Sequence, residues 1–171
     1  MNRRRQSAVR LLVGNFILVT IVAQANHYLA PWQVHLWLGG LLVTPAALTA
    51  RHRAGGIAVF LTGLAMDATS PALFGAQALV LLAGHALVYT WRDRLARGET
   101  STQVLAAFTA NLVTFLVLAG IEARATPWTG SLPGHLLADL VASQLALVLV
   151  APWFCALQSP RPAPAGGHAT G

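Results

Sequence analysis

Charged side chains are scarce in this chain of 171 residues. Asp, Glu, Lys and Arg together make up 9% of it, against roughly 25% in a typical soluble domain. Hydrophobic residues make up 56%, and they occur in long blocks rather than in alternating stripes. The scarcity of charge excludes an ordinary water-soluble domain, and the long blocks predict an all-α integral membrane protein.

Cysteine is nearly absent and lysine is entirely absent. The single cysteine, Cys155, excludes an internal disulfide and a cysteine-based metal cluster. All eleven basic residues are arginines, and the net charge is +6. The arginines are scattered between apolar blocks and form no basic stripe, so we expect no nucleic-acid partner.

Six apolar stretches are close to the length that a helix needs to cross the hydrocarbon core, about 20 residues. They cover residues 8–29, 32–50, 54–68, 72–91, 102–121 and 132–157. The sequence therefore predicts one domain over residues 1–157, a compact bundle of six transmembrane helices. Residues 158–171 are rich in Pro, Ala and Gly, and we expect them to form a disordered cytoplasmic tail.

The arginines also predict how the bundle is oriented. If both termini face the cytoplasm, ten arginines fall on the inner side and only Arg124 falls on the outer side. This is the asymmetry of the positive-inside rule. The basic start, the apolar run and the triplet Ala23-Gln24-Ala25 also imitate a cleavable signal peptide. The arginine count favours a first span that is retained.

Asp67 is the only charged residue between Arg53 and Arg92, and it falls at the outer end of the third apolar stretch. Ser70 and Pro71 follow it in the pattern of a helix N-cap and a proline at the first helical position. A carboxylate just before a helix start is stabilised by free amides and the helix dipole. The alternative is contact with a partner chain or a ligand, because ionisable groups at membrane depth are functional candidates.

Other polar residues are expected at the same outer end of the bundle. His135 and Asp139 lie four residues apart in the last stretch, hence on one helix face that Ser143 extends. They form either a set of interfacial groups and internal hydrogen bonds or a polar contact zone that faces the periplasm. The remaining members of this outer polar zone are Asn26, His27, Glu122 and Arg124.

Catalytic and metal-binding patterns are not evident among these groups. The chain has no HExxH motif, and its histidines show no tight ligand spacing. Ser70, His135 and Asp139 could be drawn as a hydrolytic triad, but nothing in the sequence brings them together. We therefore expect no metal, no cofactor and no catalytic residue.

Two kinds of residue inside the apolar stretches are expected to be structural. His85 and Asn111 are expected to form hydrogen bonds between helices. The tryptophans fall near the predicted span boundaries, where amphipathic rings anchor helices at the membrane interface. These are Trp32, Trp37, Trp91, Trp128 and Trp153.

The stretch GIAVFLTGLAMDATSPALFGAQALVLLAGHALVYTWRDRL, residues 56–95, resembles the MreD family, the small multi-span rod shape-determining proteins of bacteria. The shared pattern is Gly63, Asp67, a Ser/Pro-type turn, Gly75, and an apolar span that ends in Tyr89 before a basic loop. The size of the chain, the six predicted spans and the inner N-terminus are also similar to the family.

The resemblance implies a non-catalytic scaffold of the lateral-wall elongation machinery in the bacterial inner membrane. Such proteins pair with MreC, a bitopic protein with a periplasmic domain. Through MreC they help to link the cytoplasmic actin-like filament to the glycosyltransferase and transpeptidase that build peptidoglycan. The residues expected to define the hairpin or to contact MreC are Asp67, Ser70, Pro71 and Gly75.

A second function remains open because the family is similar in fold to the substrate-binding subunits of energy-coupling-factor transporters. The chain would then bind a vitamin or a metal and couple to cytoplasmic ATPases through small residues on a helix face. Candidates for that face are Gly39, Gly40, Ala46, Ala47 and Ala50.

Overall fold

The computed structural model describes residues 2–70, 73–93, 100–125 and 132–158. These residues form only helices, which confirms the predicted all-α class. In order they are α1 (Asn2–Leu29), the short 3-10 helix η1 (Ala30–Trp32), α2 (Gly39–Thr49), α3 (His52–Asp67), α4 (Ala76–Trp91), α5 (Thr100–Ala125) and α6 (Leu132–Gln158).

Three of the helices are long and apolar enough to cross a membrane. The relevant stretches are Val9–Trp32, Ser101–Arg124 and Pro133–Gln158, which belong mainly to α1, α5 and α6. They indicate a membrane protein. The other three helices are shorter: α2 has 11 residues, and α3 and α4 have 16 residues each.

The second apolar stretch, residues 32–50, differs from the prediction of one continuous helix. η1 ends at Trp32, Gln33 adopts a left-handed conformation with φ 56°, and α2 begins only at Gly39. Residues 34–38 between them have no regular secondary structure. At 1.5 Å per residue, α2 is therefore only about 16 Å long.

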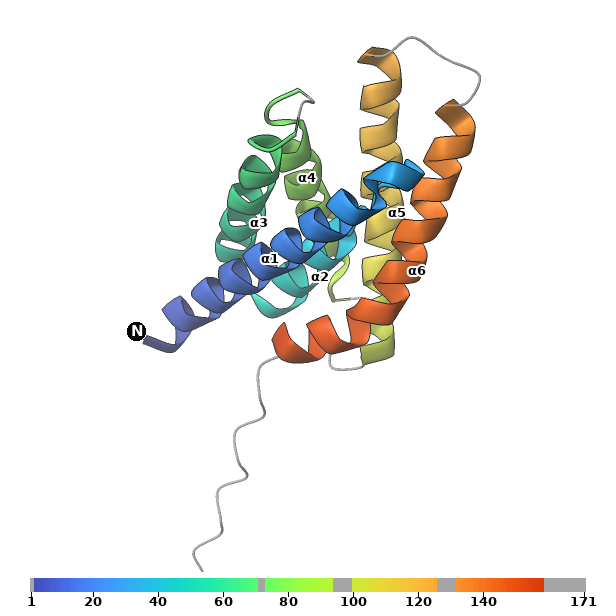
Figure 1. Cartoon of the computed structure of the whole chain (residues 1–171). Helices are drawn as coiled ribbons and strands as arrows, with labels where there is room; N and C mark the ends of the chain where they lie inside the picture. Colours follow the sequence, from blue (N-terminus) through green and yellow to red (C-terminus); the bar gives the residue numbers. More distant parts are fainter. Residues whose placement is uncertain (1, 71–72, 94–99, 126–131, 159–171) are drawn as a thin grey trace, which may run out of the picture.

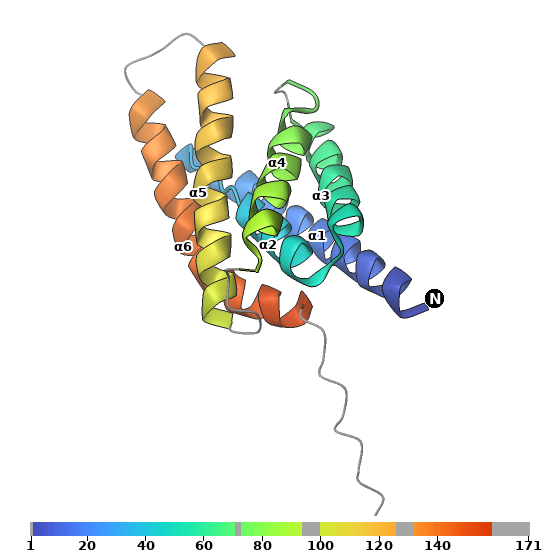
Figure 2. The ribbon, with the colours of Figure 1, turned by 180° about the vertical axis from the view of Figure 1, so that it is seen from behind.

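The helices surround α2. α3 packs against α4 and α5 packs against α6, so that two antiparallel hairpins flank α2 while α1 crosses the bundle obliquely (Figures 1 and 2). The start of α1, the start of α5 and the end of α6 lie at one end of the bundle in Figure 1. The end of α3, the start of α4, the end of α5 and the start of α6 lie at the other end. We call it the outer end after the orientation predicted from the sequence.

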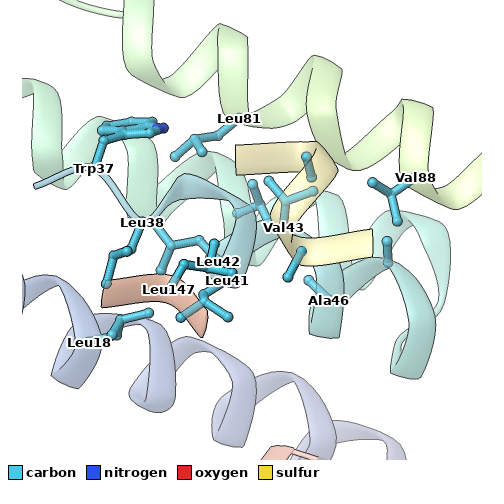
Figure 3. Packing of buried hydrophobic residues seen from close by; sticks show 14 of the residues in the cluster. Leu18, Trp37, Leu38, Leu41, Leu42, Val43, Ala46, Leu81, Val88 and Leu147 are labelled. Carbon is cyan, nitrogen blue, oxygen red and sulfur yellow. The ribbon is translucent and has the colours of Figure 1, made fainter. Parts of the chain in front are cut away.

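The core of the bundle is built on α2. All its residues from Gly39 to Ala47 are buried, as expected of a short helix enclosed on every side. Figure 3 shows its leucines and valine packed among Leu18 of α1, Leu81 of α4 and Leu147 of α6. Trp37 is also part of this core, so the prediction that it anchors the chain at the membrane interface is wrong. Of the other described tryptophans, Trp32, Trp91 and Trp153 are exposed.

Two glycines allow helices to approach closely. A Cβ atom at Gly40 of α2 would lie 2.1 Å from the carbonyl oxygen of Ala107 in α5. A Cβ atom at Gly63 of α3 would lie 2.4 Å from the Cα atom of Ala78 in α4. Since both neighbours are backbone atoms, any larger residue would push the helices apart.

Candidate functional site

Asp67 ends α3, and it connects that helix to the next one. Asp67 is buried, with 2% of its surface exposed. The carboxylate accepts hydrogen bonds from the backbone N–H groups of Gln77 and Ala78, each 3.0 Å long. These are the second and third residues of α4, whose first N–H groups have no acceptor within the helix. The carboxylate of one helix thus caps the next, where the helix dipole stabilises its charge. We call this arrangement the Asp67 cap.

The start of α4 corrects the prediction made for Ser70 and Pro71. The residue at the N-cap position is Gly75, and no side chain of its own makes the cap. The Ser70 N–H donates to the Asp67 carbonyl oxygen over 3.2 Å, so Ser70 continues the end of α3 instead of starting α4. Pro71 lies outside the described residues. A glycine has no side chain that could cap the helix, and Asp67 supplies the missing acceptor from a distance.

Gly63, Asp67 and Gly75 all contribute to the hairpin of α3 and α4. Gly63 lets the backbone of α3 approach Ala78, the same residue whose N–H binds Asp67. Gly75 has φ 91°, a left-handed conformation that non-glycine residues rarely adopt. The close approach, the cap and the turn together hold α3 and α4 at a fixed spacing and register.

The non-helical residues before α2 are held by side chains from other helices. The side chain of Asn26 in α1 binds both polar backbone groups of Leu36. Its Nδ2 donates to the carbonyl oxygen over 3.1 Å, and its Oδ1 accepts from the N–H over 2.7 Å. Asn26 therefore pairs with Leu36 as a neighbouring strand would.

The helix α6 supplies two further acceptors to the same segment. The N–H of His35 donates to Oδ1 of Asp139 over 2.7 Å, and the N–H of Trp37 donates to Oγ of Ser143 over 2.8 Å. Asp139 and Ser143 lie one helical turn apart in α6, and this spacing matches the spacing of the two backbone N–H groups, which are two residues apart. The predicted shared face of Asp139 and Ser143 is used in this way.

The helix α5 completes the arrangement. Oδ1 of Asn111 accepts from the N–H of Gly40 in the first turn of α2 over 3.1 Å. Oγ1 of Thr114 accepts from the indole N–H of Trp37 over 3.1 Å. We call Asn26, Asn111, Asp139 and Ser143 the polar clamp. These side chains satisfy backbone groups of a segment that has no regular secondary structure to pair them.

The remaining members of the predicted outer polar zone take no part in the polar clamp. His27, Glu122, Arg124 and His135 are exposed. His85 is fully buried in α4, where its Nε2 lies 3.2 Å from the carbonyl oxygen of His52 and its ring stacks on that of His52. Within the described residues, no three His, Cys, Asp or Glu side chains are grouped so that they could hold a metal ion.

Thr114 was not among the residues singled out from the sequence. It follows Asn111 by three positions and thus shares its helix face, a signal that could have identified it. His35 was not singled out either, and its contribution is a backbone N–H that it donates to Asp139.

A cavity of about 310 Å³ lies beside the polar clamp and the Asp67 cap. Its walls come from α1, residues 35–38, the first turns of α2, the end of α3 and the start of α4. Asn26 and His35, from α1 and the segment before α2, line it together with Ser70 and Gln77, from the end of α3 and the start of α4. The two polar arrangements of the outer end thus border a common space.

Comparison with models of known protein families, with curated proteins and with solved structures gives no match for this chain.

Proposed function

We propose that this protein is a non-catalytic membrane scaffold of the bacterial cell-wall elongation machinery, of the MreD type. It lies in the inner membrane with both termini in the cytoplasm and pairs with a bitopic MreC-like protein. Through that partner it helps to link an actin-like filament to the glycosyltransferase and transpeptidase that build peptidoglycan.

The observation that carries the proposal is the joint role of Gly63, Asp67 and Gly75. The resemblance to the MreD family rests on these residues, and each contributes to the same α3–α4 hairpin. If the match were due to chance between apolar sequences, the matched residues would not be expected to form a close approach, a cap and a left-handed turn in the same hairpin. The motif therefore encodes a defined hairpin rather than general hydrophobicity.

The proposed six-span topology is supported by lengths and charges. The helices α3 and α4 each reach about 24 Å, and residues 34–37 can add at most about 13 Å to the length of α2. Each segment can thus cross most of a hydrocarbon core about 30 Å thick. Arg51 and Arg53 at the α2–α3 junction and Arg92 after α4 carry the basic charge expected of inner loops.

A substrate-binding transporter subunit receives less support. The small residues that could have coupled to ATPases are buried inside the bundle: Gly39, Gly40, Ala46, Ala47 and Ala50. They pack α2 against its neighbours and present no surface to a coupling subunit. An oxygen atom of each residue of the polar clamp likewise binds a backbone N–H group of the chain itself.

The test is a pull-down of the full-length tagged protein from its native host in mild detergent, with mass spectrometry of the captured proteins. We expect a bitopic MreC-like protein with a periplasmic domain, together with wall synthases. An unrelated tagged multi-span protein of the same host is the control. Capture of a pair of ATPases with a coupling subunit would overturn the proposal in favour of a transporter.

The variant Asp67→Ala tests how the cap relates to the partner. Because the carboxylate is buried and bonded within the chain, this variant should retain the MreC-like protein when equal amounts of folded protein are compared. Loss of the partner from folded Asp67→Ala protein would assign the carboxylate a direct contact instead.

A further inference from the structure

The cavity at the outer end has both apolar and polar groups in its walls. Most of its lining side chains are apolar, such as Val22 and Ala23 of α1 and Met66 of α3. A few polar groups also line it, among them Asn26 and Gln77. Ligand sites typically combine apolar walls with a few placed polar groups in 300–1,000 Å³, and this cavity lies at the small end of that range.

The charge of the lining restricts what the cavity could bind. Among the described residues that line it there is no Asp, Glu or Arg, and His35 is the only titratable one. The nearby Asp67 carboxylate is turned to the amides of α4. Because an ion would need a partner charge in an apolar site, the cavity fits an uncharged molecule.

One polar group in the wall has no hydrogen-bond partner among the described residues. Asn26 and Thr69 already bind backbone groups of Leu36 and Met66. Oε1 of Gln77, by contrast, is buried and accepts no hydrogen bond from any described residue. The terminal torsion of a glutamine side chain is soft, so its amide can turn this oxygen toward a donor in the cavity.

The wall formed by α1 offers an entry route. Of the three long apolar helices, α1 is the least buried, and it crosses the others obliquely (Figure 1). A helix with few internal contacts separates from its neighbours at low cost. The cavity beneath it is therefore reachable from the side of the bundle.

We propose that this cavity binds an uncharged amphiphile, an aliphatic chain that ends in a hydroxyl or amide donor for Gln77. The molecule could be a neutral bilayer lipid or a free aliphatic alcohol, which share this chemistry. The proposal is independent of the scaffold function, since it concerns a space that neither the Asp67 cap nor the polar clamp fills.

The experiment uses two photoreactive probes on the full-length protein in lipid nanodiscs: octanol carrying a diazirine, and its methyl ether. Labelled peptides are mapped by mass spectrometry. The variant Ala23→Trp fills the cavity, whereas Ala83→Trp places the same residue on an exposed face of α4 away from it. The variant Gln77→Leu keeps the backbone N–H that binds Asp67 and removes only the acceptor.

We expect the alcohol to label cavity peptides of α1 and α3, and Ala23→Trp but not Ala83→Trp to abolish this labelling. The alcohol should label about fivefold more than the ether, the effect of one hydrogen bond, and Gln77→Leu should remove that preference. Diacylglycerol in the nanodisc and a short alcohol in the buffer are then tested as competitors of the labelling. The one that reduces it shows whether the natural ligand is a bilayer lipid or a free alcohol.

Even labelling over the lipid-facing surface, unchanged by Ala23→Trp, would overturn the proposal. Equal labelling of the cavity by alcohol and ether in the unmodified protein would overturn the role of Gln77 as acceptor. The melting temperature of each variant is measured in parallel, so that a folding defect is separated from a loss of binding.

Discussion

The two connections at the outer end of the bundle solve the same problem in different ways. Between α3 and α4, the Asp67 carboxylate accepts hydrogen bonds from two free N–H groups at the start of α4, and Gly75 forms the turn before that helix. Between α1 and α2, the irregular residues before Gly39 take acceptors from α1 and α6, and α5 binds the first turn of α2. The first connection is held within its own hairpin, and the second depends on the whole bundle.

The difference follows from the geometry of free N–H groups. The amides at a helix start point in one direction, so a single carboxylate can accept two of them and gains from the dipole. Successive amides of an extended segment point to opposite sides, so each needs its own acceptor. The α3–α4 hairpin should therefore form early and locally, whereas residues 33–38 become ordered only when α1, α5 and α6 are in place.

The largest effects should come from the two close approaches that set helix spacing in these regions. Gly40→Val and Gly63→Val each place side-chain atoms where backbone of Ala107 or Ala78 lies. Overpacking against backbone should cost about 3 kcal/mol, the upper end of the usual range, and reduce the yield of folded protein. The measurement is the melting temperature in detergent. Gly120→Val is the matched control, since nothing lies within 4 Å of a Cβ there, and it should melt at or above the original temperature.

Removing the Asp67 cap should have the next largest effect. Asp67→Ala leaves two buried N–H groups of α4 without an acceptor, which should lower the free energy of unfolding by about 3 kcal/mol. Asp67→Asn keeps one acceptor oxygen and should cost less. Unfolding by SDS in mixed micelles measures both. The exposed Asp93, which pairs loosely with Arg92 over 3.7 Å, provides the control Asp93→Ala, expected to change stability by less than about 1 kcal/mol.

Single substitutions in the polar clamp should have smaller effects on stability, and the effects of two such substitutions should be strongly coupled. Asn26→Ala should cost about 2 kcal/mol, because both polar groups of Leu36 lose their partner. Ser143→Ala should cost about 1 kcal/mol. The double variant should cost less than the sum, since both side chains order the same segment. Asn26→Ala combined with Asp67→Ala should instead be additive within about 0.5 kcal/mol. A coupled result for that second pair would contradict the separation of the two connections.

The smallest effects concern the two left-handed residues, and they should have opposite signs. Gly75→Ala should destabilise by about 1 kcal/mol, because φ 91° is strained for alanine although no atom obstructs its Cβ. Gln33→Gly should be neutral or stabilise by up to about 1 kcal/mol, because glycine adopts φ 56° without strain. Thermal unfolding of both variants checks the signs, and a gain in stability for Gly75→Ala would rule out the turn described here.

Several features of the bundle could be predicted from local sequence. Long apolar blocks gave the helices, and the position of Asp67 before a helix start indicated its contact with free amides. The prediction was wrong at Ser70. A Ser-Pro pair favours a helix start wherever it occurs, but α4 begins five residues after Pro71, at Ala76, and no local signal indicated this. It also failed at Trp37, whose place near a span boundary suggested the interface although the core encloses it.

The sequence by itself determined the all-helical class, because apolar content and block length act residue by residue along the chain. It also determined that the lone carboxylate of Asp67 needs a partner, because an unpaired buried charge is too costly, but it left open whether that partner is the start of the next helix or another molecule. Only the tertiary structure decided that residues 34–38 stay out of a helix. Their hydropathy suits a helix equally well, but Asn26, Asp139 and Ser143, which lie 10, 104 and 106 positions from their bonding partners, bind the backbone groups that a helix would have used.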